Sequence, residues 1–127
     1  QAKLLSAPGI IWQRRIPEKD LNAFYSSLAL FLYLSDYEGF GLPPMEALNC
    51  GTVSLLLPRS SLAELYQHLA LFVDAPEPVR IAEAIIAFLE QGEAKRQSIL
   101  ACWQTQRDYY SWLRVAQEYH RELLSQK

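Results

Sequence analysis

The apolar positions of this chain form short unbroken runs in its first two thirds and a helical spacing in its last third. Three of the runs have the length of a strand, and the unbroken run at residues 29–34 suggests a strand that is covered on both faces, as in a parallel sheet. The three runs span residues 29–34, 53–57 and 69–73. A fourth run, residues 9–12, also predicts a buried strand. The pattern therefore predicts a parallel sheet of about four strands.

Helices are predicted between these runs. Pro17 and the acidic residues after it suit the first turn of a helix. The apolar positions that follow recur at helical spacing: Leu21, Phe24, Tyr25 and Leu28. Residues 43–44 are both proline and predict the start of a second helix, which stops at Gly51.

One more helix is predicted between the last two runs, and the chain after residue 73 is predicted to be helical. Ser60 or Ser61 caps a short helix that runs through Tyr66. A later helix presents one apolar face, made of Val79, Ala82, Ile85, Ile86 and Leu89. Residues 93–107 form a more polar helix. Ser111 caps the last one, whose apolar stripe consists of Trp112, Val115, Ala116, Tyr119 and Leu123.

Strands that alternate with helices and are followed by terminal helices indicate an α/β fold. The predicted architecture is a Rossmann-like, doubly wound parallel sheet with C-terminal helices. The 127 residues have the size of one domain. Because the first residue is Gln1, we expect the chain to be part of a longer protein.

The composition indicates which class of partner and which cellular compartment suit the chain. The net charge is −2 and no block of lysines or arginines occurs, so nothing indicates a nucleic-acid partner. The longest apolar run, residues 27–34, is too short to span a bilayer, and no signal peptide is evident. Cys50 and Cys102 suit reduced cysteines, which favours a cytoplasmic location.

The segment after the predicted strand at residues 29–34 carries the candidate chemistry. In open α/β sheets, ligands bind beyond the carboxyl ends of the strands. Gly39 and Gly41 would let backbone amides approach a ligand, and the helix start near Pro44 would favour phosphate. Glu38 and Glu46 could accept hydrogen bonds from the vicinal hydroxyls of a sugar or ribose.

Residue chemistry alone leaves structural alternatives open. The two glycines could serve only a tight turn, Glu46 could be a capping acid at the third helical position, and Glu38 could be a solvated loop charge. The glycines also do not make a dinucleotide fingerprint, because Pro44 stands where the third glycine would be.

The string EGFGLPPME, residues 38–46, resembles the E-x7-E signature of the family 4 (group 1) retaining glycosyltransferases, which have the two-domain GT-B fold. The resemblance covers nearly the whole chain. Further segments that are similar to the family in register are residues 21–25, 46–52, 60–64, 72–74 and 110–112.

The resemblance implies a role for each matching residue. Glu46 would contact the ribose hydroxyls of a nucleoside diphosphate sugar, and Glu38, the implied catalytic residue, would contact the transferred sugar. The backbone from Gly39 through Phe40 and Gly41 to Leu42 would face the sugar and the diphosphate. The family requires no metal or other cofactor, and His68 and His120 offer no ligand cluster.

Three departures from the family pattern stand out. A strand–helix unit with an arginine and a lysine for the diphosphate would precede Gln1, and Lys3 is not assigned to it. The domain that binds the acceptor is also absent. Arg14 stands where the family usually has a glycine near the nucleotide. It either clashes with the usual donor pose, supplies a substitute charge, or faces solvent in a diverged loop.

Residues 1–127 are therefore expected to be one donor-binding domain of a longer two-domain enzyme. That enzyme would transfer a hexose to a glycan, a lipid or another acceptor, which it would bind through its N-terminal domain. Peripheral association of the full-length enzyme with the inner face of the membrane stays open, and the isolated chain is expected to be inactive. The alternative is a non-catalytic Rossmann-like module that binds or interacts.

Overall fold

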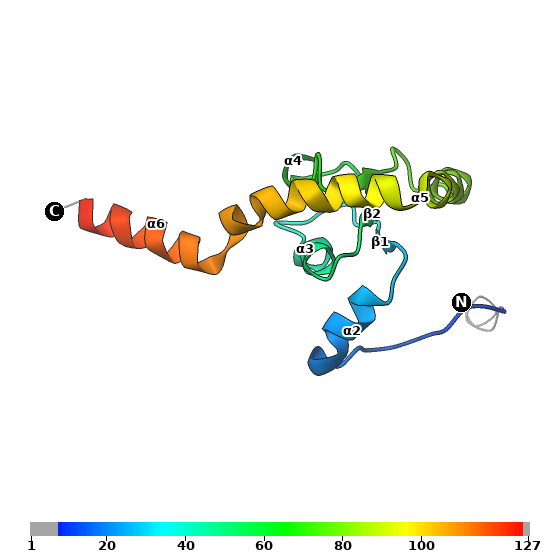
Figure 1. Cartoon of the computed structure of the whole chain (residues 1–127), viewed down its shortest axis with the longest axis horizontal. Helices are drawn as coiled ribbons and strands as arrows, with labels where there is room; N and C mark the ends of the chain where they lie inside the picture. The colour runs from blue at the N-terminus through cyan, green and yellow to red at the C-terminus, as the bar shows by residue number, and fades with distance from the viewer. Residues whose placement is uncertain (1–7, 126–127) are drawn as a thin grey trace.

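The computed structural model describes residues 8–125, so Lys3 lies outside the described residues. Short strands alternate with helices and are followed by long helices, as predicted (Figure 1). With 3-10 helices labelled η, the elements are η1 (Glu18–Asp20), α2 (Leu21–Ser26), β1 (Phe31–Tyr33), α3 (Leu42–Asn49), β2 (Ser54–Leu56), α4 (Ser61–Leu65), β3 (Leu71–Phe72), α5 (Pro78–Gln106), η2 (Arg107–Tyr110) and α6 (Trp112–Ser125).

The three strands form one parallel sheet in the order β1-β2-β3. Phe31 pairs with Ser54, and Leu55 pairs with Leu71. This confirms the α/β class and the strands predicted from three of the four apolar runs. The observed sheet has one strand fewer than the four predicted.

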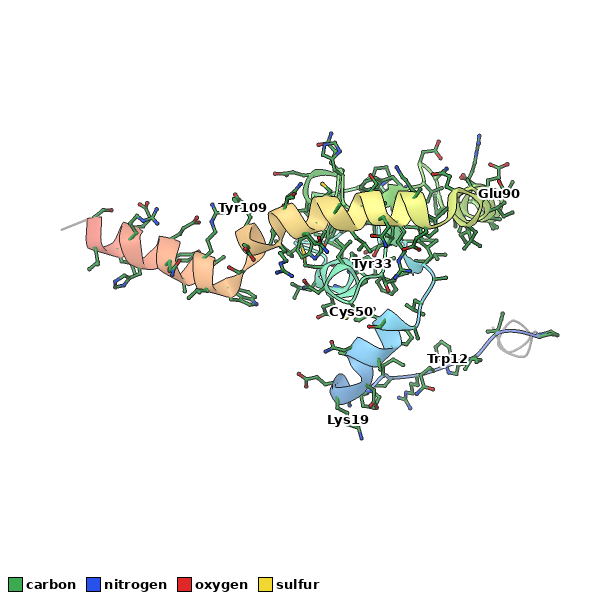
Figure 2. The ribbon with its side chains drawn as sticks, viewed as in Figure 1. Trp12, Lys19, Tyr33, Cys50, Glu90 and Tyr109 are labelled. Carbon is green, nitrogen blue, oxygen red and sulfur yellow. The ribbon has the colours of Figure 1, made fainter. Side chains whose placement is uncertain are left out.

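The strand predicted at residues 9–12 is wrong. Ile11 is 91% exposed and Trp12 is 66% exposed, and neither pairs with the described sheet. Figure 2 shows Trp12 on the extended segment that leads toward α2. An apolar run becomes a strand only when a neighbouring strand takes up its backbone hydrogen bonds. None of the three described strands does so for this run.

Helices cover the sheet on both faces, which is why its central strand is wholly apolar or small. On one face Leu55, Leu57 and Val73 pack against Ile81 and Ile85 of α5. On the other face lies the larger cluster, which draws on α3, α4 and both halves of α5: Met45, Leu48, Val53, Leu56, Leu62, Tyr66, Leu69, Phe88, Ile99 and Trp103. Arg96 of α5 also bonds the carbonyl of Gly51, just after α3.

One helix reaches both faces because it bends at Gly92. The backbone there has φ 59° and ψ −148°, a conformation that glycine adopts readily and other residues do not. The first half of α5 is seen nearly end-on in Figure 1, and the second half runs lengthwise. The two predicted helices are thus confirmed as the two halves of α5, with the break at Gly92.

The predicted apolar face of the first of these helices is largely wrong. Val79, Ile86 and Leu89 are exposed, whereas Ile81, Ala84 and Ile85 pack on the sheet and Phe88 is buried. The helix carries apolar residues on more than one side. Only the direction from which it approaches the sheet selects the buried stripe.

Helix α6 begins as predicted but its apolar stripe stays exposed. The hydroxyl of Ser111 accepts a hydrogen bond from the amide of Arg114 at 3.3 Å, which confirms the cap. Trp112, Tyr119 and Leu123 are all exposed, because α6 extends away from the sheet (Figure 1). Among the described helices, none is both long and apolar enough to cross a membrane.

Replacing Leu56 by alanine should lower the free energy of unfolding by about 2–5 kcal/mol. Leu56 is fully buried in the larger cluster, on the face of the sheet that carries α3. Urea unfolding followed by circular dichroism measures the effect. Leu113→Ala, on the exposed surface of α6, is the matched control and should change stability by less than about 0.5 kcal/mol. Equal effects of the two changes would contradict the assigned core.

Candidate functional site

The carboxyl ends of the three strands meet at one edge of the sheet because the strands are parallel. The loop after β1 carries the motif segment, which we define as residues 38–46. The loop after β2 carries Arg59 and Ser60. These two loops come from neighbouring strands and touch each other at this edge.

Side chains of the second loop and of the first residue of α4 hold the backbone of the first loop. The hydroxyls of Ser60 and Ser61 each donate a hydrogen bond to the carbonyl of Glu38, both at 2.8 Å. Arg59 forms an ion pair with Asp36, just upstream of the motif segment. The prediction that one of these serines caps α4 is therefore correct for the position of Ser60 and wrong for its hydroxyl, which bonds Glu38 and not the helix. Ser60 precedes α4, but no side chain caps the helix.

Gly41 is locked to the core beneath it. Its φ is 75°, and a Cβ built on it would lie 2.5 Å from Cδ2 of Leu62. Its carbonyl accepts a hydrogen bond of 2.6 Å from the hydroxyl of Tyr66, which is fully buried. No other residue fits here without strain. Gly41 therefore does serve a tight turn, which was one of the alternatives. The same turn fixes where the neighbouring amides lie.

Three consecutive amides at this edge have no protein acceptor within the described residues. Helix α3 starts at Leu42, one residue before the predicted proline pair. Pro43 and Pro44 carry no N–H, so the usual set of donors at a helix start is incomplete. Within residues 8–125, the amides of Phe40, Gly41 and Leu42 donate to no protein acceptor. A negatively charged or oxygen-rich group would bind to these amides.

Glu46 lies in the second turn of α3, so its predicted place in the first turn is wrong. The capping alternative is wrong as well. Its carboxylate is exposed and accepts a hydrogen bond of 3.0 Å from the hydroxyl of Tyr25 in α2. One carboxylate oxygen, Oε2, is used by this bond, which leaves Oε1 available to a ligand.

Glu38 is arranged in the same way. The hydroxyl of Tyr33, at the end of β1 and beside α3 in Figure 2, donates a hydrogen bond of 2.5 Å to its Oε1. Hydrogen bonds from Tyr33 and then from Ser35 lower the pKa of Glu38 below its usual value. The carboxylate is therefore charged at neutral pH. This pairing shows that Glu38 is more than a solvated loop charge.

The two tyrosines were missed by the sequence reasoning. Burial and then the bond to Glu46 raise the pKa of Tyr25 to about 12, and burial and then the bond to Glu38 do the same for Tyr33. Both hydroxyls thus remain protonated donors. Tyr25 and Tyr33 were counted with the apolar core. A tyrosine within an apolar run indicates a polar contact, because a buried phenol hydroxyl usually has a hydrogen-bond partner.

Arg14 is not brought to this edge by any contact. It is exposed in the segment before η1, and within the described residues it makes no ion pair or hydrogen bond. The solvent-facing alternative agrees with this arrangement, and a nucleotide contact stays a prediction. Cys50 and Cys102 are both free thiols, as expected. Residues 8–125 hold no group of three or more His, Cys, Asp or Glu side chains suited to a metal ion.

The motif segment is an open edge rather than a closed cavity. A hollow of about 620 Å³ lies instead at the joint of α5 and α6. It touches the motif segment only through Tyr110, whose ring lies 6.2 Å from that of Phe40. Phe40 and Leu42 are both partly exposed at the edge. A second surface would be needed to enclose a ligand here.

Comparison with known proteins points to one family. Residues 2–100 match the model of the family described as glycosyl transferases group 1. The chain is 33% identical over 97 residues to the O-antigen chain mannosyltransferase B of Escherichia coli, covering 76% of this chain and 25% of that protein. It is 33% identical over 115 residues to the serotype-specific mannosyltransferase WbdA of Escherichia coli, covering 88% of this chain and 14% of that protein.

Replacing Gly41 by alanine should lower the free energy of unfolding by about 1–3 kcal/mol, because the added Cβ meets Leu62 and the backbone has a positive φ. Gly39→Ala is the matched control, since a Cβ there meets open space and should cost less than about 1 kcal/mol. Urea unfolding of both variants checks this. A larger loss in Gly39→Ala would show that the loop is held differently.

Proposed function

The chain belongs to the group 1 glycosyltransferases, and from that premise we propose that it is the donor-binding domain of a longer, retaining hexosyltransferase. The donor is a nucleoside diphosphate sugar. The matched part spans a quarter or less of the curated relatives' length, so the remaining machinery belongs to other parts of such a protein. Because both relatives are named mannosyltransferases, mannose is the sugar we expect.

The arrangement of the motif segment carries this proposal. It combines two carboxylates, each with an oxygen free of its tyrosine partner, and three amides that donate to no described acceptor. Carboxylates hold vicinal hydroxyls, and amides hold phosphate oxygens. A nucleoside diphosphate sugar carries both kinds of group within one molecule. Glu46 then binds the ribose, and Glu38 binds the transferred sugar.

Catalysis in this proposal is mainly positioning and electrostatic stabilisation. The bond between the sugar and the diphosphate breaks, the acceptor oxygen bonds to the anomeric carbon with the same configuration, and the acceptor proton leaves with the diphosphate. Glu38, the residue assigned to catalysis, lies beside the sugar. The amides of Phe40, Gly41 and Leu42 face the diphosphate. Its charge also requires cationic side chains, and Arg59, paired with Asp36 at the same edge, is one such side chain.

The acceptor, a glycan or a lipid, is proposed to bind a further domain that faces this open edge. The reaction takes place on the cytoplasmic side, where the full-length enzyme associates peripherally with the membrane. It uses no metal or other cofactor. Arg14 would approach the nucleotide only if the segment before η1 moved toward the edge.

Binding of nucleotides tests the proposal. The chain should bind GDP-mannose weakly, and Glu46→Ala should weaken binding about tenfold or more because the ribose loses its acceptor. Saturation-transfer NMR and calorimetry with GDP-mannose, UDP-glucose and ADP-glucose measure this. Glu90→Ala, on the exposed surface of α5 (Figure 2), is the control and should leave binding unchanged. Failure to bind any of them at millimolar concentration would favour a non-catalytic module.

The 127-residue chain by itself should not transfer sugar, because a leaving diphosphate needs more compensating charge than this edge supplies. Incubation with GDP-mannose and simple mannoside acceptors, followed by mass spectrometry of the products, measures transfer. Turnover at ordinary enzyme rates, about 1 per second or faster, would contradict the proposed division of labour between domains.

A further inference from the structure

The two glutamates of the motif segment share one structural device. Glu38 accepts a hydrogen bond of 2.5 Å from Tyr33, and Glu46 accepts one of 3.0 Å from Tyr25. The donors come from different elements, Tyr33 from β1 and Tyr25 from α2. In both pairs a phenol binds one carboxylate oxygen only. The remaining oxygen of each glutamate does not bind its tyrosine, and its lone pairs can accept a hydrogen bond from a ligand.

The two phenols belong to one continuous set of rings, the aromatic row Phe24, Tyr25, Phe31 and Tyr33. The Phe24 and Tyr25 rings lie 5.5 Å apart. Tyr25 and Phe31 meet edge to face at 5.3 Å, and Phe31 and Tyr33 stack at 6.0 Å. Tyr25 is only 6% exposed. Rings packed in this way have few rotamers left, so their hydroxyls are fixed before any ligand arrives.

The direction of each hydrogen bond is also fixed. The pKa of both tyrosines lies at about 12, so the phenol donates and the carboxylate accepts over the whole working range of pH. A free glutamate side chain would lose rotamer freedom when it bound a sugar hydroxyl. A glutamate already held by a tyrosine would lose much less, which favours binding.

We propose that Tyr33 and Tyr25 are positioning residues, which hold Glu38 and Glu46 in the orientation that the hydroxyls of the donor require. This rests on the proposed function, because it assigns Glu38 to the sugar and Glu46 to the ribose. The aromatic row connects the two positions, so the spacing between the sugar contact and the ribose contact is set by packed rings rather than by the loop. Neither tyrosine contacts the reacting atoms.

The assignment predicts a split between two ligands. Tyr33→Phe keeps the ring and removes the hydroxyl that holds the sugar contact. It should weaken binding of GDP-mannose about tenfold and leave binding of GDP nearly unchanged. Tyr25→Phe removes the hydroxyl that holds the ribose contact, so it should weaken binding of both ligands by about the same factor. A merely structural role would give no such split. Calorimetry and NMR titration of the 127-residue chain measure it.

Three controls make the result decisive. Tyr119→Phe, on the exposed face of α6, should leave both affinities unchanged. Tyr33→Phe should add nothing when Glu38 is already alanine, and Tyr25→Phe should add nothing when Glu46 is already alanine. In the unliganded protein, carbon-13 NMR of the Glu38 carboxyl should show that its pKa rises toward the usual value in Tyr33→Phe, since that bond is the main cause of its depression.

The outcomes separate the two proposals. If the wild-type chain binds GDP-mannose and both phenylalanine variants bind both ligands equally well, the positioning inference is overturned. If the pKa of Glu38 does not move in Tyr33→Phe, the part that concerns Tyr33 is overturned even without a ligand. If the wild-type chain binds no nucleotide while that pKa does move, the proposed function fails and the tyrosine–glutamate pair stands.

Discussion

The parallel pairing of β1 with β2 is the constraint on which the rest of the structure depends. It aligns Phe31 with Ser54 and so puts the loops after both strands at the same edge of the sheet. In this register Ser60 and Ser61 donate hydrogen bonds to the carbonyl of Glu38. The motif segment is therefore held by hydrogen bonds from another loop as well as by its own turn.

Packing beneath the edge holds the aligned loops and the two glutamates in place. Tyr66 and Leu62 fill the space under Gly41 from below, and the aromatic row fixes the glutamates from the side. The break at Gly92 allows α5 to cover both faces of the short sheet, which excludes water from its central strand. The groups at the edge that keep hydrogen-bonding capacity for a ligand are thus few: two carboxylates, and three amides without a described acceptor.

Several apolar surfaces of the molecule, and the motif segment itself, are not covered by any described part of the chain. The apolar residues 9–12 and the stripe of α6 are exposed, and the motif segment forms an open edge without an enclosing wall. A diphosphate bound there would need further cations than Arg59 provides. These features agree with a chain that spans a quarter or less of the relatives it matches.

Local pattern determined much of the fold, since strand length, proline positions and turn residues depend on neighbours in the chain. Residues 29–34, 53–57 and 69–73 each contain one of the strands, and EGFGLPPME identified the family. Tertiary structure alone decided which residues meet. The strand at 9–12 found no described partner, the buried stripe of α5 lay elsewhere than predicted, and the phenols of Tyr25 and Tyr33 reached the two glutamates. Such contacts depend on directions of packing, which no local pattern encodes.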